Sequence, residues 1–215
     1  MTAKGPLQQA KQPAWPGVAK VRAGEGAIVH VSRRLVPKTN GDTFVELGLR
    51  LDEAPVPERR YPADFAWVDI AEGLVRIMFG QRRISGKSLR SLVIVAMTEE
   101  TARNFLSTCK DFTPKLRTYL ERTSIPESTL DVQPEEPDQT VVLMANIVAI
   151  AHSGNEACID FYHASARSLH DAISRSVNQL GVEPLVRIFL TGSLLAGTLA
   201  AIERKLPESG FKEAK

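Results

Sequence analysis

Hydrophobic and polar residues follow the same order in two separate segments of this chain. Residues 69–81 (DIAEGLVRIMFGQ) align without a gap with residues 151–163 (AHSGNEACIDFYH). The alignment places two apolar residues of the first segment on identical residues of the second: Ile77 on Ile159 and Phe79 on Phe161. Short alternating runs on both sides of a turn are typical of a β-hairpin, so each segment is expected to form one.

The similarity continues after a connector in each copy. Residues 93–98 (VIVAMT) align with residues 186–191 (VRIFLT), and a helix-like pattern follows each. The alignment offset grows from 82 to 93 positions, so the second connector is longer by 11 residues. A duplication in this order predicts two copies of one strand, strand, strand, helix unit, packed as an intramolecular pseudo-dimer.

In the first copy, residues 64–70 and 73–80 are expected to pair as a hairpin that turns near Ala71-Glu72. With a two-residue turn, the expected pairs are Val68 with Val75 and Ala66 with Ile77 on the core side, and Phe65 with Met78 and Trp67 with Arg76 on the other. The apolar run 92–97 indicates a central strand, and Thr98 is expected to cap the helix that follows.

In the second copy, residues 141–152 and 155–162 are expected to pair around Ser153-Gly154, with Val148 facing Ile159 and Ile150 facing Ala157. Apolar residues then recur at helical spacing, which predicts a helix in the longer connector: Leu169, Ile173, Val177 and Leu180. Gly181 would end this helix and Pro184 would begin the last strand, followed by a helix over 192–205.

Turn signals divide the rest of the chain. Asn40-Gly41 predicts a hairpin between strands 28–36 and 43–51, because a type I′ turn needs positive φ at both central residues. Residues 123–140 are acidic and proline-rich, which is typical of a linker. The expected segments are a flexible tail (1–24), a first repeat with the N-terminal hairpin (25–122), the linker (123–140), a second repeat (141–206) and a tail (207–215).

We therefore expect an α+β protein of two related antiparallel β-sheet and helix units that share one core. Its motif resembles a family of short prokaryotic proteins known only as a domain of unknown function. The matching residues are Ala145, Asn146, Val148, Ile150, Ile159, Asp160 and Phe161 in the second copy, and Ile77, Phe79, Gly80, Gln81 and Thr98 in the first. The resemblance covers roughly 61–122 and 141–206. The resemblance implies the fold but no activity, because the family has no known function. Family members carry one copy of the unit, so the tandem arrangement differs from them.

Composition limits the class of protein. The chain is 43% hydrophobic, and its net charge of +2 hides an imbalance of about +7 before residue 123 and about −5 after it. This imbalance favours docking between the halves or an anionic partner for the first half. Two surfaces that are simply solvated differently would give the same charge imbalance. Cys109 and Cys158 have no CxxC spacing, which indicates thiols of a reducing cytoplasm. The apolar stretch 186–202 is interrupted and too short for a bilayer, so no membrane partner is expected.

Catalytic and cofactor motifs are weak. His152, Glu156, Asp160 and His163 cluster around one hairpin, but the histidines and the carboxylates are expected on opposite faces. The segment 192–198 (GSLLAGT) lacks the lysine of a phosphate loop, so close helix packing explains its glycines better. No catalytic residue, metal or cofactor is therefore predicted, and the protein is expected not to be an enzyme.

Two surfaces of the first copy are candidates for binding. The connector after its hairpin carries four cations that could hold phosphate or another anion: Arg82, Arg83, Lys87 and Arg90. The alternatives are an ordinary solvated loop, or a loop that docks on the acidic half of the chain. The hairpin face opposite the core is aromatic and carries a methionine: Phe65, Trp67, Arg76 and Met78. Ile147 and Ala149 take the places of Phe65 and Trp67 in the second copy. Either the N-terminal hairpin covers this face or a partner does.

The best functional hypothesis is a cytoplasmic, non-enzymatic module that binds another protein through an exposed sheet face or edge. Self-association is compatible with this hypothesis. A second hypothesis is binding of nucleic acid or another anion through the basic connector. A third is a chaperone-like client binder, on an analogy of architecture alone.

Overall fold

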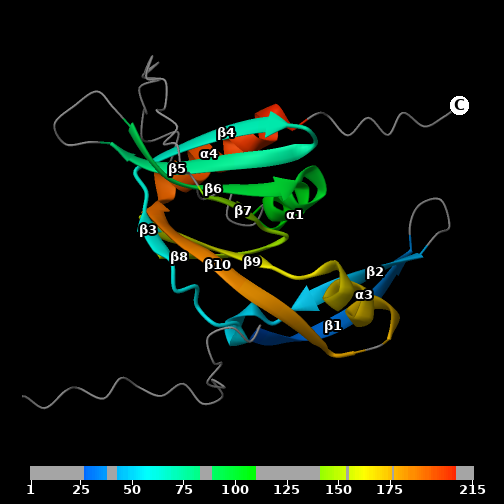
Figure 1. Cartoon of the computed structure of the whole chain (residues 1–215). Coiled ribbons are helices and arrows are strands. Elements are labelled where there is room, and N and C mark those ends of the chain that lie inside the picture. The colour runs from blue at the N-terminus through cyan, green and yellow to red at the C-terminus, as the bar shows by residue number, and fades with distance from the viewer. Residues whose placement is uncertain are drawn as a thin grey trace, which may run out of the picture.

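The computed structural model describes residues 27–37, 43–82, 89–109, 141–153, 155–175 and 177–206 (Figure 1). The strands are β1 (Ala27–Pro37), β2 (Thr43–Leu49), β3 (Arg60–Pro62), β4 (Phe65–Ala71), β5 (Leu74–Arg82), β6 (Leu89–Thr98), β7 (Val142–Met144), β8 (Ile147–Ser153), β9 (Glu156–His163) and β10 (Gln179–Thr191). The helices are α1 (Glu99–Cys109), α3 (Ala166–Ser174) and α4 (Gly192–Lys205), with a 3-10 turn at Leu51–Glu53. The expected Asn40-Gly41 turn, tails and linker lie outside the described residues.

The strands form two sheets, which makes the protein α+β as expected. The first sheet has the order β4-β5-β6-β7, and the second has the order β2-β1-β10-β9-β8 with β3 added on β10. Most neighbours are antiparallel; the parallel pairs are β6 with β7 and β10 with β3. None of the described helices is long and apolar enough to cross a membrane.

The chain passes from one sheet to the other at two corners. β3 pairs with β10 in the second sheet and leads directly into β4 of the first, while β7 pairs with β6 in the first sheet and leads into β8 of the second. At the corners, the buried Ala63 donates its N–H to the Phe189 carbonyl (2.8 Å) and Ala145 donates to the Ala96 carbonyl (2.9 Å). Strands that switch sheets in this way join two packed sheets at their edges.

A polar side chain follows each corner alanine and forms hydrogen bonds with the backbone at the end of a neighbouring strand. Asp64 Oδ1 accepts a hydrogen bond from the N–H of Arg82 at the end of β5 (2.8 Å). Asn146 Oδ1 accepts from the N–H of Ala164 (2.8 Å), and its Nδ2 donates to the Ala164 carbonyl (2.7 Å). Because Ala164 is buried, these bonds replace water that its backbone cannot reach.

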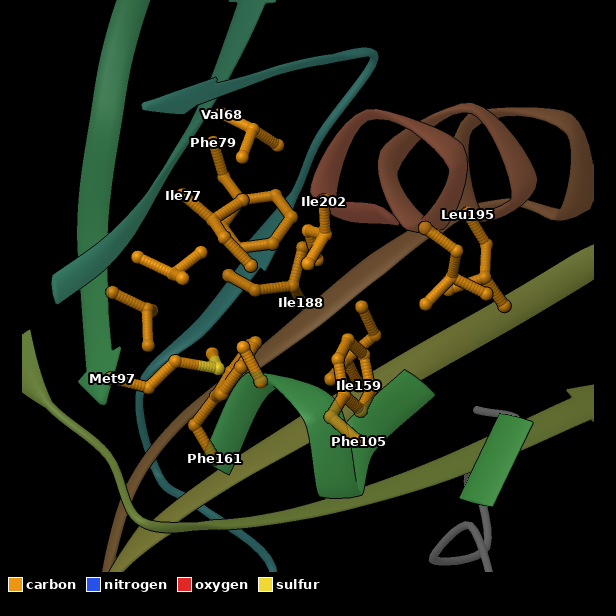
Figure 2. Close-up of a cluster of buried hydrophobic side chains, with 14 of the residues drawn as sticks. Val68, Ile77, Phe79, Met97, Phe105, Ile159, Phe161, Ile188, Leu195 and Ile202 are labelled. Atoms are coloured by element: carbon orange, nitrogen blue, oxygen red, sulfur yellow. The ribbon is translucent and has the colours of Figure 1, made fainter. Parts of the chain in front are cut away.

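The inner faces of both sheets pack into one hydrophobic core (Figure 2). The Phe79 and Phe161 rings, which align in the repeat, meet with their centroids 5.9 Å apart and their planes tilted by 52°. Helices α1 and α4 add Phe105, Leu195 and Ile202 to the same core. The two copies therefore do not have separate cores.

Both repeat helices begin as the sequence predicts. Thr98 Oγ1 accepts from the N–H of Thr101 (3.2 Å), and Thr191 Oγ1 accepts from the N–H of Leu194 (3.2 Å). Each threonine satisfies one of the backbone donors that a helix start leaves free. The last helix spans Gly192–Lys205, as expected.

The predicted pairing of both hairpins is wrong by two residues. The first turn is Glu72-Gly73, at φ 54° and 73°, rather than Ala71-Glu72. The observed pairs are Val68 with Ile77, Ala66 with Phe79, Trp67 with Met78 and Phe65 with Gly80; in the second hairpin, Val148 with Phe161 and Ile150 with Ile159. Positive φ at both turn residues matches the twist of the strands, so Ala71 stays paired with Leu74. A shift of two residues leaves every side chain on its predicted face.

The connector helix is shorter than expected. It ends at Ser174, and β10 begins at Gln179, so Gly181 and Pro184 lie inside a strand. Gly181 pairs with Ile28 of the N-terminal hairpin, a contact distant in sequence that overrides the helical spacing. Pro184 lies beside a bulge, where the ladder tolerates a missing N–H.

The N-terminal hairpin extends the second sheet. β1 pairs with the first residues of β10, from Ala27 with Val182 to His30 with Gln179. Leu47, Leu49 and Leu51 pack on a second cluster that includes Tyr162, together with Leu169 and Ala172 of α3. Of the two alternatives for the aromatic face of the first copy, covering by this hairpin is therefore wrong.

Replacing Phe79 or Phe161 with alanine should lower the free energy of unfolding by about 3–5 kcal/mol, because each fully buried ring leaves a cavity. Since both belong to one core, either substitution should shift a single transition in urea, with circular dichroism and amide hydrogen exchange in agreement. Two transitions, of which only one moves, would contradict the shared core.

Asn146→Ala should lower the free energy of unfolding by about 1–3 kcal/mol, because the buried N–H and carbonyl of Ala164 lose their partners. Asn146→Asp keeps the acceptor but loses the donor, so its carboxylate faces the Ala164 carbonyl and it should also lower the free energy of unfolding. The measurement is the urea midpoint at unchanged slope. An unchanged free energy of unfolding in Asn146→Ala would contradict this role of the side chain.

Candidate functional site

The outer face of the first sheet, opposite the core, carries an unbroken line of apolar side chains. Trp67 of β4 is paired with Met78 of β5, Met78 with Ile94 of β6, and Ile94 with Val142 of β7. Directly opposed residues place their side chains on one face. These four residues, here called the apolar row, span about 14 Å across the strands, from the usual strand spacing of about 4.8 Å.

The apolar row is open at both ends. Trp67 is 48% exposed and Val142 is 52% exposed, whereas Met78 in the middle is 7% exposed. Met144, two residues further along β7 and so on the same face, is 44% exposed. Helices α1 and α4 contribute to the core between the sheets and α3 to the cluster on the second sheet, so no described helix packs on the row.

The four residues singled out from the sequence lie together on this face. Phe65 is half-buried opposite Gly80, where a Cβ would approach the Arg90 carbonyl oxygen to 2.6 Å, so only glycine fits beside the bulge of β6. Arg76 lies opposite Asp69 and reaches Glu72 at 4.0 Å. With Trp67 and Met78 they form an aromatic, methionine-containing surface with one guanidinium at its rim.

A cation from another element reaches the exposed tryptophan. The Nζ of Lys205, in the last turn of α4, lies 5.4 Å from the centre of the Trp67 ring. An ammonium over an aromatic face is attracted by the ring quadrupole, by about 0.5–1 kcal/mol at exposed sites. Lys205 therefore marks the β4 end of the row with a positive charge.

The corresponding positions of the second sheet are polar. By the repeat alignment, the row there reads Ala149, Asp160, Arg187 and Arg60, paired in that order. Asp160 and Arg187 form two hydrogen bonds, and this pairing raises the pKa of Arg187. The Tyr162 hydroxyl donates to Asp160 (3.3 Å); burial, followed by the Asp160 charge, raises the pKa of Tyr162. An ion pair that is largely buried thus takes the place that Met78 and Ile94 have in the first sheet.

The basic connector is only partly described. Arg82 and Arg90 are exposed, whereas Arg83 and Lys87 lie outside the described residues. Arg82 is paired with Leu89 and Arg90 with Gln81, so the two arginines occupy adjacent rungs and point to opposite faces. The described residues therefore do not bring these two guanidiniums together.

Residues considered for a metal site lie on the β8-β9 hairpin, and those considered for a phosphate loop lie in α4. In the described part of the chain, no three His, Cys, Asp or Glu side chains gather as a metal site. A Cβ on Gly192 would lie 3.3 Å from His152 Nε2, which fits the close packing expected there, but Gly197 faces open space and does not. Burial raises the pKa of the Cys109 thiol to about 12, so it stays protonated at neutral pH.

Sequence reasoning missed half of the apolar row. Ile94 reads as the interior of a continuous apolar strand, which hides its outward orientation. Val142 and Met144 reach the face only because β7 adds to β6 in parallel, a pairing between distant residues. The available signal was the apolar run 141–144, which the sequence assigned to the second copy alone.

Comparisons of the chain with protein-family models, with curated proteins and with solved structures find no match. The apolar row is aligned across four strands and exposed at both ends, with cations beside Trp67 and at the rim.

The polar row of the second sheet gives a test of why the two faces differ. In a Tyr162→Phe background, Arg187→Ile should cost about 3–5 kcal/mol of unfolding free energy, since it leaves Asp160 buried without its partner. Adding Asp160→Met recreates the apolar pair of the first sheet and should restore the stability or exceed it. Urea denaturation measures the stability of both variants. If adding Asp160→Met does not restore the stability lost through Arg187→Ile, this account is contradicted.

Proposed function

We propose that this protein is a cytoplasmic, non-enzymatic protein-binding module whose contact surface is the outer face of the first sheet. The observation that carries the proposal is the apolar row, with Trp67 and Val142 each about half exposed. An apolar row that crosses a whole sheet and is exposed at both ends is not needed to fold the chain, because the core lies on the opposite face. Exposed apolar side chains grouped on one face in this way favour an interaction site.

The composition of this face favours a protein partner over a small ligand. Tryptophan, methionine and arginine are enriched at protein interfaces, and tryptophan is prominent among the residues whose loss costs most binding energy. Trp67 has a large exposed surface at one end of the row, and the unbranched Met78 beside it can adapt to different neighbours.

We infer further that the two copies form an intramolecular pseudo-dimer. The bulge of β6 falls at Leu92 and that of β10 at Leu185, positions that align in the repeat. The corner bonds of Ala63 and Ala145 also align, and each copy gives its leading strand, β3 or β7, to the sheet of the other. This arrangement supports one copy specialised for binding and a second that keeps a polar face.

Two other functions remain as proposals with less support. Exposed Arg82 and Arg90 favour a nucleic acid or another anion as ligand, with a contact that salt would weaken. A chaperone-like binder of unfolded chains would use the same apolar row with little sequence preference. Retention on RNA at low salt, or capture of many unrelated unfolded proteins, would favour these over a specific partner.

Trp67→Ser should abolish capture of the partner from a native lysate while leaving the circular dichroism and the urea midpoint within about 1 kcal/mol of the parent, as for an exposed position. The matched control is Phe189→Ser on the outer face of the second sheet, where the ring is 41% exposed. It should leave capture intact. Unfolding by Trp67→Ser, or equal loss in both variants, would contradict the proposed surface.

A further inference from the structure

The size of the exposed apolar surface limits what can dock on it. The apolar row is about 14 Å wide. Phe65 lies two residues to one side of the row and Met144 two residues to the other, so the surface extends over about four residue spacings along the strands, or roughly 13 Å. A stable dimer of folded subunits buries about 800 Å² on each partner, several times this footprint. The surface is too small for a second copy of the chain, but it matches one short helix.

The protein uses such a helix on its own second sheet. The nine-residue α3 packs Leu169 and Ala172 against the outer face of that sheet, beside Ile147 and Tyr162. Ile147 is the counterpart of Phe65, so the covered surface is next to the polar row. The first sheet has the shorter connector, and no described helix takes the corresponding place.

Lys205 indicates the charge that such a helix would carry. Its side chain is exposed and lies over Trp67, and the described residues include no carboxylate in an ion pair with it. By contrast, Arg76 at the rim already has Asp69 and Glu72 beside it. An acidic residue next to the apolar stripe of a docked helix would pair with Lys205 at the β4 end of the row.

We propose that the apolar row binds an amphipathic helix of about three turns whose apolar stripe covers Trp67, Ile94 and Val142 and whose flanking carboxylate pairs with Lys205. This deepens the function proposed above and rests on it. It specifies the class of partner, a helical and acidic segment of another protein. It also assigns Lys205 as the residue that selects the charge of that segment.

The experiment uses synthetic peptides and the full chain. One peptide has about twelve residues, with leucines at helical spacing and glutamates beside the stripe, and its counterpart carries lysine at each glutamate position. The protein carries Trp15→Phe, so that Trp67 is its only tryptophan. Fluorescence titration should show the acidic peptide bound more tightly, and Trp67→Ser, followed by isothermal titration, should weaken it at least tenfold.

Lys205→Glu tests whether Lys205 determines the preference for the acidic peptide over the basic one. It should weaken the acidic peptide about three- to tenfold and strengthen the basic one, as expected for one exposed ion pair reversed. The matched control is Arg204→Glu, which makes the same change of charge one position earlier in α4 and should leave the preference unchanged. If both substitutions act alike, the effect is long-range electrostatics and Lys205 does not select the partner.

The outcomes separate this inference from the proposed function. If Trp67→Ser abolishes partner capture but neither peptide binds, or an extended apolar peptide binds better, the surface stands and the helical partner is wrong. Sedimentation of the chain as a dimer that Trp67→Ser dissociates would identify a second copy as the occupant. Strong protection of Trp67 from acrylamide in the free protein, with no binding of any peptide or partner, would overturn both proposals.

Discussion

Neither sheet of this protein can bury its inner face alone. Each inner face is buried against the other sheet, and Phe79 contacts Phe161 across that interface. The two rings come from aligned positions, so the meeting point lies where two related units are expected to face one another. The remaining architecture follows from bringing these faces together. Strands must cross between the sheets at their edges, and the helices after β6 and β10 supply the rest of the core.

With the inner faces committed to the fold, the outer faces are free to differ. On the second sheet, Asp160 and Arg187 form a bidentate ion pair, and the N-terminal hairpin and α3 build a further cluster beside it. On the first sheet, the same positions are Met78 and Ile94, between Trp67 and Val142. Buried ion pairs add little stability over well-packed apolar residues, so the difference is more easily explained by what each face contacts.

Much of the fold could be predicted from the sequence because its signals are local. Threonine caps, alternating strands and the closing helix depend on neighbouring residues, and they appear near where the pattern puts them. The register of the hairpins depended on turn geometry at Glu72-Gly73, and the start of β10 on pairing with a strand about 150 residues earlier. Trp67 and Met78 could be found from alternation within one hairpin. Val142 could not, because its place on the surface is set by a parallel pairing across the linker.

The exchange of β3 and β7 between the sheets has a consequence for the covalent chain itself. Each half of the molecule pairs an edge strand of its own with the other half, β3 with β10 and β7 with β6, in addition to the pairing of β1 with β10 and the shared core. Cleavage of the peptide backbone between Cys109 and Val141 would therefore leave two fragments that are interlaced rather than merely adjacent. Such a nicked protein would stay associated until it unfolded, since neither fragment could leave without breaking the pairing of β3 with β10 and of β7 with β6.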